Sequence, residues 1–202
     1  MQNDIFSLCQ WIEIDSKQSE KYDVAFYFEQ ADLDPQGVDL FGELPKIYLH
    51  KGDLKLDKSF SMYAQGFGVF ILDGSLEVDG TFGFYTADAY TVLIITGEIR
   101  VKNMAIGWDS QLGVGRSLIA DQILWVSLSH AGFLVIKETI KAKTIRLHKE
   151  TCVSLGFPPV GNILEFPLQF NKEFSSRYQI APGEQPDIKI IIQALDEGVR
   201  LF

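Results

Sequence analysis

The chain has 202 residues, of which 47% are hydrophobic and 22% charged, a composition that fits one folded domain and excludes a disordered chain. Acidic residues outnumber basic ones by 27 to 18, and the formal charge of −9 disfavours a nucleic-acid partner, because phosphate backbones recruit Lys and Arg. The longest stretch without Asp, Glu, Lys or Arg, 122–136, is shorter than the roughly 20 residues of a membrane-spanning helix. Residues 1–4 lack the positive charge of a signal peptide, so we expect a cytoplasmic protein with no membrane span.

Residues 1–45 carry apolar positions without a repeat, and we expect them to form an N-terminal cap. Within them, residues 4–14 fit a short helix bearing Phe6, Cys9 and Trp11, and a pair of strands covering the first turn of the domain is the alternative. Cys9 and Cys152 are too few and too far apart for a disulfide framework or a zinc cluster, so we predict buried thiols.

Residues 46–148 contain an internal repeat, which we expect to form the core of the domain. Five segments share one apolar alternation: Lys51–Asp57, Asp73–Asp79, Thr96–Lys102, Gly115–Asp121 and Lys137–Lys143. Their second positions, Gly52, Gly74, Gly97, Arg116 and Glu138, are separated by steps of 22, 23, 19 and 22 residues. A period of this length is typical of a solenoid.

Each repeat unit contains three apolar pairs with period 2, the pattern of a strand with one buried face. The first pairs are Leu54/Leu56, Leu76/Val78, Ile99/Val101, Leu118/Ala120 and Ile140/Ala142. The second pairs are Phe60/Met62, Phe82/Phe84, Met104/Ile106, Ile123/Trp125 and Ile145/Leu147. The third pairs precede the glycine position, as Ile47/Leu49, Val69/Ile71, Val92/Ile94, Leu112/Val114 and Phe133/Val135. The pattern predicts a mainly β protein, a single-stranded, three-faced parallel β-helix of about five to six turns. A right-handed coil is favoured for turns of this length.

The outward positions support the same alignment, because stacked turns place equivalent residues about 4.8 Å apart, where like charges repel. One outward column alternates in sign at its first two steps, through Lys55, Glu77 and Arg100. The next column has one like-charge step and then three opposite ones, in the order Asp57, Asp79, Lys102, Asp121 and Lys143.

Two further regions follow the repeat. Residues 149–185 contain Pro158, Pro159 and Pro167 and a weak echo of the repeat at 161–163, which indicates a degenerate turn plus loops. Residues 186–202 place Pro186 at a first helical turn and Gly198 past a periodic apolar run, which predicts a C-terminal capping helix and a tail.

The stacked Gly-x-Leu/Ile-x-Val/Ala pattern over about 46–148 resembles the β-helix of bactofilins, the polymer-forming bacterial cytoskeletal proteins. It is also similar to other bacterial β-helix proteins that carry units like Ile95-Thr-Gly-Glu-Ile-Arg-Val-Lys-Asn103. The resemblance implies a β-helix that self-associates. This chain has longer units than bactofilins, and its flanks have a folded-looking composition where theirs are short and disordered.

The sequence contains none of the common phosphate-binding, nucleophile-elbow or zinc-protease motifs. His50, His130 and His148 lack metal-ligand spacing. We therefore expect no cofactor, no metal and no catalysis.

Chemistry-bearing side chains gather at one corner of the predicted turns, between the second and third strands. The candidate ligand- or partner-binding residues there are Tyr63, Tyr85, Asp88, Tyr90, Trp108, Asp109, Ser129 and His130. Stacked aromatic rings and carboxylates can bind sugars, whereas the structural alternative is that the rings only cover a narrow core. A hydrolytic set of Asp109, Ser129 and His130 is disfavoured, because sequence neighbours usually point in different directions. Asp88 and Asp109 are the only stacked carboxylates for glycoside cleavage.

The sequence favours a non-enzymatic scaffold or protein-interaction module whose partner is itself or another protein, with a homo-oligomer as one outcome. Its contact surface would be a flat sheet face or the corner. The first alternative is a carbohydrate- or ligand-binding β-helix that uses the corner. The second is an immunity-type protein that neutralises a basic partner with its acidic surface.

Overall fold

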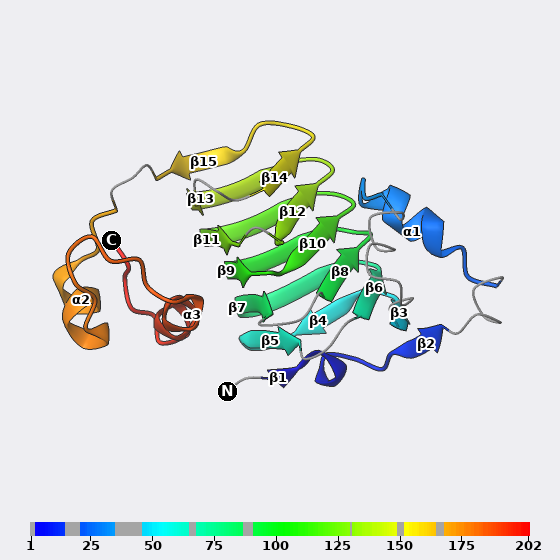
Figure 1. The fold of residues 1–202 in the computed structure, drawn as a ribbon, viewed down its shortest axis with the longest axis horizontal. Helices are drawn as coiled ribbons and strands as arrows, with labels where there is room; N and C mark the ends of the chain where they lie inside the picture. The colour runs from blue at the N-terminus through cyan, green and yellow to red at the C-terminus, as the bar shows by residue number, and fades with distance from the viewer. Residues whose placement is uncertain are drawn as a thin grey trace.

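The structure is a computed structural model that describes residues 3–14, 21–34, 46–64, 68–86, 91–129, 131–148, 152–164 and 168–202. Parallel strands stack in about five coils to form a β-solenoid, with helices at the C-terminal end of the chain (Figure 1). The predicted fold class is confirmed.

Each coil contributes strands to two sheets. The first sheet contains, in spatial order, β1 (Asn3–Asp4), β5 (Phe60–Ala64), β7 (Leu76–Thr86), β9 (Ile99–Trp108), β11 (Leu118–Leu128), β13 (Ile140–Leu147) and β15 (Val160–Ile163), with β4 (Leu54–Leu56) also paired to β7. The second sheet contains β14 (Cys152–Leu155), β12 (Phe133–Ile136), β10 (Gln111–Val114), β8 (Thr91–Ile95), β6 (Gly68–Asp73), β3 (Lys46–Lys51) and β2 (Ile12–Ile14). All neighbours are parallel except β2 and β3.

The first predicted column is correct in register and in direction. Leu76 pairs with Leu54 and with Ile99, and the same column continues through Leu118 to Ile140. In β7, β9, β11 and β13 the first and second predicted strands form one strand with a shift of register in its middle. Such irregularities bend a strand, so one sheet supplies two of the three faces of the coil.

The second column is correct except in β11. There Leu124 and Val126 point into the core, and the predicted pair Ile123 and Trp125 points outward beneath the C-terminal helices. The reason is an extra residue at the bend: β11 takes three steps from Ala120 to Ile123, where β9 takes two from Val101 to Asn103. Because side chains alternate between the two faces of a strand, one inserted residue reverses which side chains beyond it face the core.

The third column is wrong in four of its five turns. The inward residues of β6 and β8 include Phe70, Leu72, Leu93 and Ile95, whereas the predicted pairs in β3, β6 and β8 lie on the outer face. In β12 the inward residues are Leu134 and Ile136, and only the pair Leu112/Val114 is correct. Because β6 and β8 are buried on both faces, their sequences do not alternate and cannot reveal the inward side.

Helices cover the outer faces of both sheets. α1 (Val24–Gln30) packs Tyr27 and Phe28 onto the second sheet. α2 (Lys172–Tyr178) and α3 (Ile188–Asp196) form an apolar cluster on the outside of the first sheet, and α3 contacts β7 and β9. The C-terminal helix is therefore present as predicted, but it lies along the side of the coil (Figure 1).

The N-terminal end of the coil is covered by residues 3–14. These residues form β1, a 3-10 helix at Ile5–Ser7 and β2, so the segment combines a short helical turn with two strands, of which β1 pairs with β5 and β2 with β3. Ile5, Leu8 and Trp11 pack against the inner core, so this segment closes the first turn. The outward charge column is partly realised, since Lys55 pairs with Glu77 at 2.6 Å while Arg100 pairs with Glu98.

Candidate functional site

Three of the predicted corner residues form an aromatic ladder across successive coils. Tyr63 and Tyr85 are paired in register, with ring centroids 5.6 Å apart. Trp108 meets the ring of Tyr85 edge-on at 5.3 Å. The parallel register thus brings together side chains that lie 22 or 23 residues apart in sequence.

The middle ring of this ladder is covered, whereas Tyr63 and Trp108 are half-buried. Only 2% of Tyr85 is exposed, and it belongs to the apolar cluster that includes α3. The Lys189 ammonium of α3 lies 4.9 Å from the centroid of the Trp108 ring, a cation–π contact. Tyr85 therefore joins the sheet to the helix, as in the structural alternative, and the sugar-binding role of the corner stays a prediction.

The chain turns sharply after the ladder. Trp108 has a φ of +59°, which is uncommon for a bulky residue and indicates local strain. The turn is held by the Ser110 hydroxyl, which donates to the Gly107 carbonyl at 2.8 Å, and by the Ser129 amide, which donates to the Trp108 carbonyl at 2.8 Å. These bonds fix the turn at the edge of the ladder.

Asp109 and Ser129 are also brought together, because the Ser129 hydroxyl donates to the Asp109 carboxylate. This contact links two neighbouring coils at an exposed position. The remaining predicted residues Asp88, Tyr90 and His130 lie outside the described part of the chain. The described residues therefore show a serine bonded to a carboxylate, which is ordinary turn chemistry.

A cavity of about 430 Å³ lies beside the ladder, between α3 and the strands β5 and β7. Its lining combines one cation with two carboxylates and a few neutral groups: Ser61, Tyr85, Lys189, Ile192, Gln193, Asp196 and Glu197. Glu197 accepts hydrogen bonds from the Gln193 amide at 2.8 Å and from the Tyr178 hydroxyl at 2.9 Å, and these bonds lower the pKa of its carboxyl group. Its carboxylate therefore links α2 to α3.

Burial shifts the pKa of two other ionisable side chains, Arg146 and Cys9. Arg146 is 1% exposed and its guanidinium lies 5.7 Å from the Trp125 ring centroid; burial lowers its pKa to about 10. Burial also raises the pKa of the Cys9 thiol to about 12, which makes this thiol unreactive at neutral pH. Cys152, predicted as a buried thiol, is instead exposed on β14.

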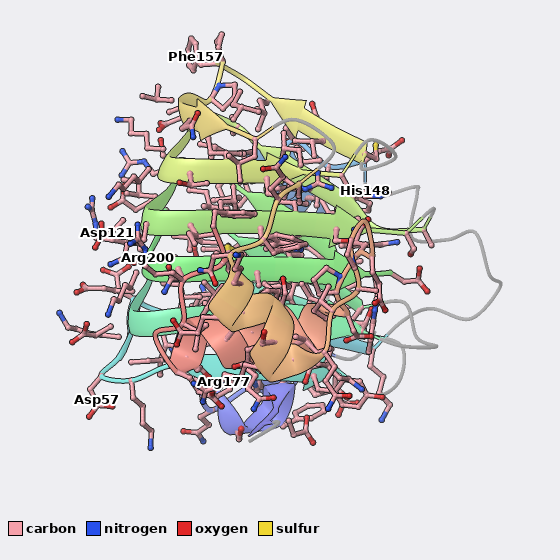
Figure 2. The ribbon with its side chains drawn as sticks, turned by 90° about the vertical axis from the view of Figure 1, so that its left-hand side faces the viewer. Asp57, Asp121, His148, Phe157, Arg177 and Arg200 are labelled. Carbon is pink, nitrogen blue, oxygen red and sulfur yellow. The ribbon has the colours of Figure 1, made fainter. Side chains whose placement is uncertain are left out.

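A second surface lies at the C-terminal end of the coil. β14 and β15 are the last strands of the two sheets, and their outer edges have no described strand beside them. Phe157, Val160 and Ile163 are 62%, 59% and 48% exposed there, and Phe157 stands at the top of the stack in Figure 2. We call this surface, residues 152–163, the C-terminal coil end.

None of the predicted corner residues lies in the C-terminal coil end, so the sequence prediction missed this surface. A signal for it is present in the sequence, since Cys152 to Leu164 contains no charged residue and no histidine in a protein with a net charge of −9. From periodicity alone this run is predicted to be a degenerate turn of the repeat, because Gly161 and two prolines interrupt it.

Comparisons with protein-family models, with curated proteins and with solved structures gave no match. The class of this protein is therefore defined by its fold, a β-solenoid with helices on its outer faces. Within the described ranges, no helix has the length and apolar character needed to cross a membrane. The same ranges contain no group of three His, Cys, Asp or Glu side chains placed to hold a metal ion.

Proposed function

We propose that this protein is a non-enzymatic scaffold that self-associates through its C-terminal coil end. The observation that supports the proposal is the combination of two strand edges that pair with no described strand and the exposed side chains of Phe157, Val160 and Ile163. Natural proteins usually protect such edges with charges or prolines, since an open edge is a template for pairing with another chain. β14, with the sequence Cys-Val-Ser-Leu, has neither protection.

The proposed occupant is a second copy of this chain. Each copy has a net charge of −9, so two copies approach most easily through a surface without charges, and the C-terminal coil end has none. If a two-fold axis through β14 related the two copies, their β14 strands would pair antiparallel. Such a contact is isologous, because both copies use the same surface. β15 is a weaker edge, because Pro158 and Pro159 precede it and Gly161 interrupts it.

The opposite end favours a closed dimer over a filament. β1 is two residues long, and β2 carries Glu13, which is paired with Lys46. Short and charged edge strands resist addition of a further strand. This differs from the open polymers that the bactofilin resemblance implies. The saccharide-binding and partner-neutralising alternatives stay predictions.

Light scattering coupled to size exclusion tests the proposal over a series of protein concentrations. We expect a monomer–dimer equilibrium that Val160→Lys abolishes, because the lysine of each copy would place a charge in an otherwise uncharged contact surface. Phe26→Lys is the matched control, since Phe26 is also exposed, at 48%, but lies on α1. A monomer at every concentration, or a dimer that Val160→Lys leaves intact, would overturn the proposal. Open filaments would contradict the closed dimer.

A further inference from the structure

A larger cavity lies on the outer face of the first sheet, at the bends of β9, β11 and β13. It has a volume of about 640 Å³, within the range of small-molecule sites, and the chain segment after α3 closes one side of it. Its apolar part includes Ile123, Leu195 and Phe202. No step of the proposed function uses this cavity.

The polar part of the cavity is cationic. Lys102, Lys143 and Arg200 line it, and Asp121 is the one acidic side chain among the lining residues that the structure describes. No ion pair within 4 Å joins these four charges in the described part of the chain. Asp121 and Arg200 are labelled at the same edge of the sheet in Figure 2. A local excess of positive charge in a protein of net charge −9 indicates a site for an anion.

A buried amide of the lining gives a second, independent indication of a ligand. Asn103 is 4% exposed, and its Oδ1 has no hydrogen-bond partner among the described residues. Its Nδ2 is 3.4 Å from the Thr81 hydroxyl oxygen. Turning the amide by 180° keeps a bond to Thr81, which can donate as well as accept, and presents the NH₂ group in place of the oxygen. A buried amide without its full set of bonds is costly unless a ligand completes it.

We infer that this cavity binds a small organic anion. Its phosphate or carboxylate group would lie among Lys102, Lys143 and the Asn103 amide, and its apolar part would lie against Ile123 and Leu195. Gln122 and Thr144 supply further polar groups at the same bends. The site does not depend on self-association, because it lies on the side of the coil.

Amide chemical shifts of ¹⁵N-labelled protein test the inference, with phenyl phosphate, benzoate, inorganic phosphate and uncharged phenol as probes at millimolar concentration. We expect phenyl phosphate or benzoate to shift the amides of Asn103, Gln122 and Thr144, and to bind more tightly than inorganic phosphate or phenol. Comparing phenyl phosphate with benzoate identifies which oxyanion the site prefers.

Three variants show whether the shifts report this site. Lys143→Gln should weaken binding about threefold to fivefold, the size of one exposed charge interaction. Lys141→Gln is the matched control, because Lys141 is an exposed lysine of the same strand outside the cavity. Asp121→Asn should tighten binding, since it removes the one acidic side chain. Absence of localised shifts, or shifts to which Lys143→Gln and Lys141→Gln respond equally, would overturn the inference.

Discussion

Two of the repeated glycines, Gly74 and Gly97, are required by the close approach of successive turns. Gly74 has an ordinary φ, but a Cβ there would lie 2.5 Å from the Gly52 carbonyl oxygen of the preceding turn. A Cβ at Gly97 would lie 2.3 Å from the Ser75 hydroxyl and 2.7 Å from the Gly74 carbonyl oxygen. The backbones are tied together at this point, where the Gly97 amide donates to the Gly74 carbonyl at 2.8 Å.

Gly97→Ala should therefore lower the free energy of unfolding by about 1 to 3 kcal/mol, the usual cost of overpacking. Chemical denaturation measures the loss. Arg116→Ala is the control, because it occupies the equivalent position of the next turn and already has a Cβ. An equal loss in both variants would mean that contacts between turns do not explain the glycine at position 97.

At the scale of elements, α3 lies close to the first sheet because two strand residues lack side chains. A Cβ at Gly83 of β7 would lie 2.7 Å from Ile192, and a Cβ at Gly107 of β9 would lie 2.7 Å from Ile188. These glycines provide the groove into which one face of α3 packs. The helix thereby buries Ile188 and Ile191 and covers the aromatic ladder.

Glu197 then holds α2 against α3, since the Arg177 and Tyr178 side chains of α2 both contact it. Its hydrogen bonds lower its pKa below the ordinary 4.5, so the unfolded chain takes up this proton first as the pH falls. The stabilisation is present above about pH 4.5 and is lost as the pH drops through the lowered pKa. Glu197→Gln should lower the melting temperature at neutral pH, and this effect should shrink as the pH falls below 4.5.

Thermal melts followed by circular dichroism at neutral pH and at a series of pH values below 4.5 check this expectation. Asp196→Asn is the control, because it removes one neighbouring exposed charge that forms no ion pair in the described part of the chain. If both variants lower the melting temperature equally, or if the effect of Glu197→Gln does not shrink as the pH falls below 4.5, the contacts of Glu197 are not the cause.

The same elements show what sequence alone can predict. The repeat and its first column follow from alternation, because the segment from Leu76 to Val78 has one buried and one exposed face. Alternation fails in β6 and β8, where α1 makes the outer face apolar as well. It fails in β11 because the prediction gave its bend the same spacing as the bend of β9, whereas β11, like β7, has one residue more there. The aromatic ladder follows from the register, whereas its cover by α3 depends on long-range packing that periodicity does not encode.

At the scale of the whole molecule, the coil is a one-dimensional stack in which each turn contacts mainly its neighbours. Stability in such a stack declines toward any end that lacks a neighbour. The N-terminal end gains cover from Ile5, Leu8 and Trp11, whereas β15 at the other end is exposed at every residue. The two ends therefore differ both in stability and in their capacity to accept another chain.

Hydrogen exchange measured along the chain tests both properties in one experiment. At low protein concentration we expect the slowest exchange in β9 and β11, which have paired strands on both sides, and the fastest strand exchange in β15. At high concentration the amides of β14 should become more protected, because the second copy pairs with its edge. The amides of β2 should not change, since the N-terminal end takes no part in the contact. Protection that increases at β2 as much as at β14 would indicate stacking through both ends, and unchanged protection at β14 would place any self-association elsewhere on the molecule.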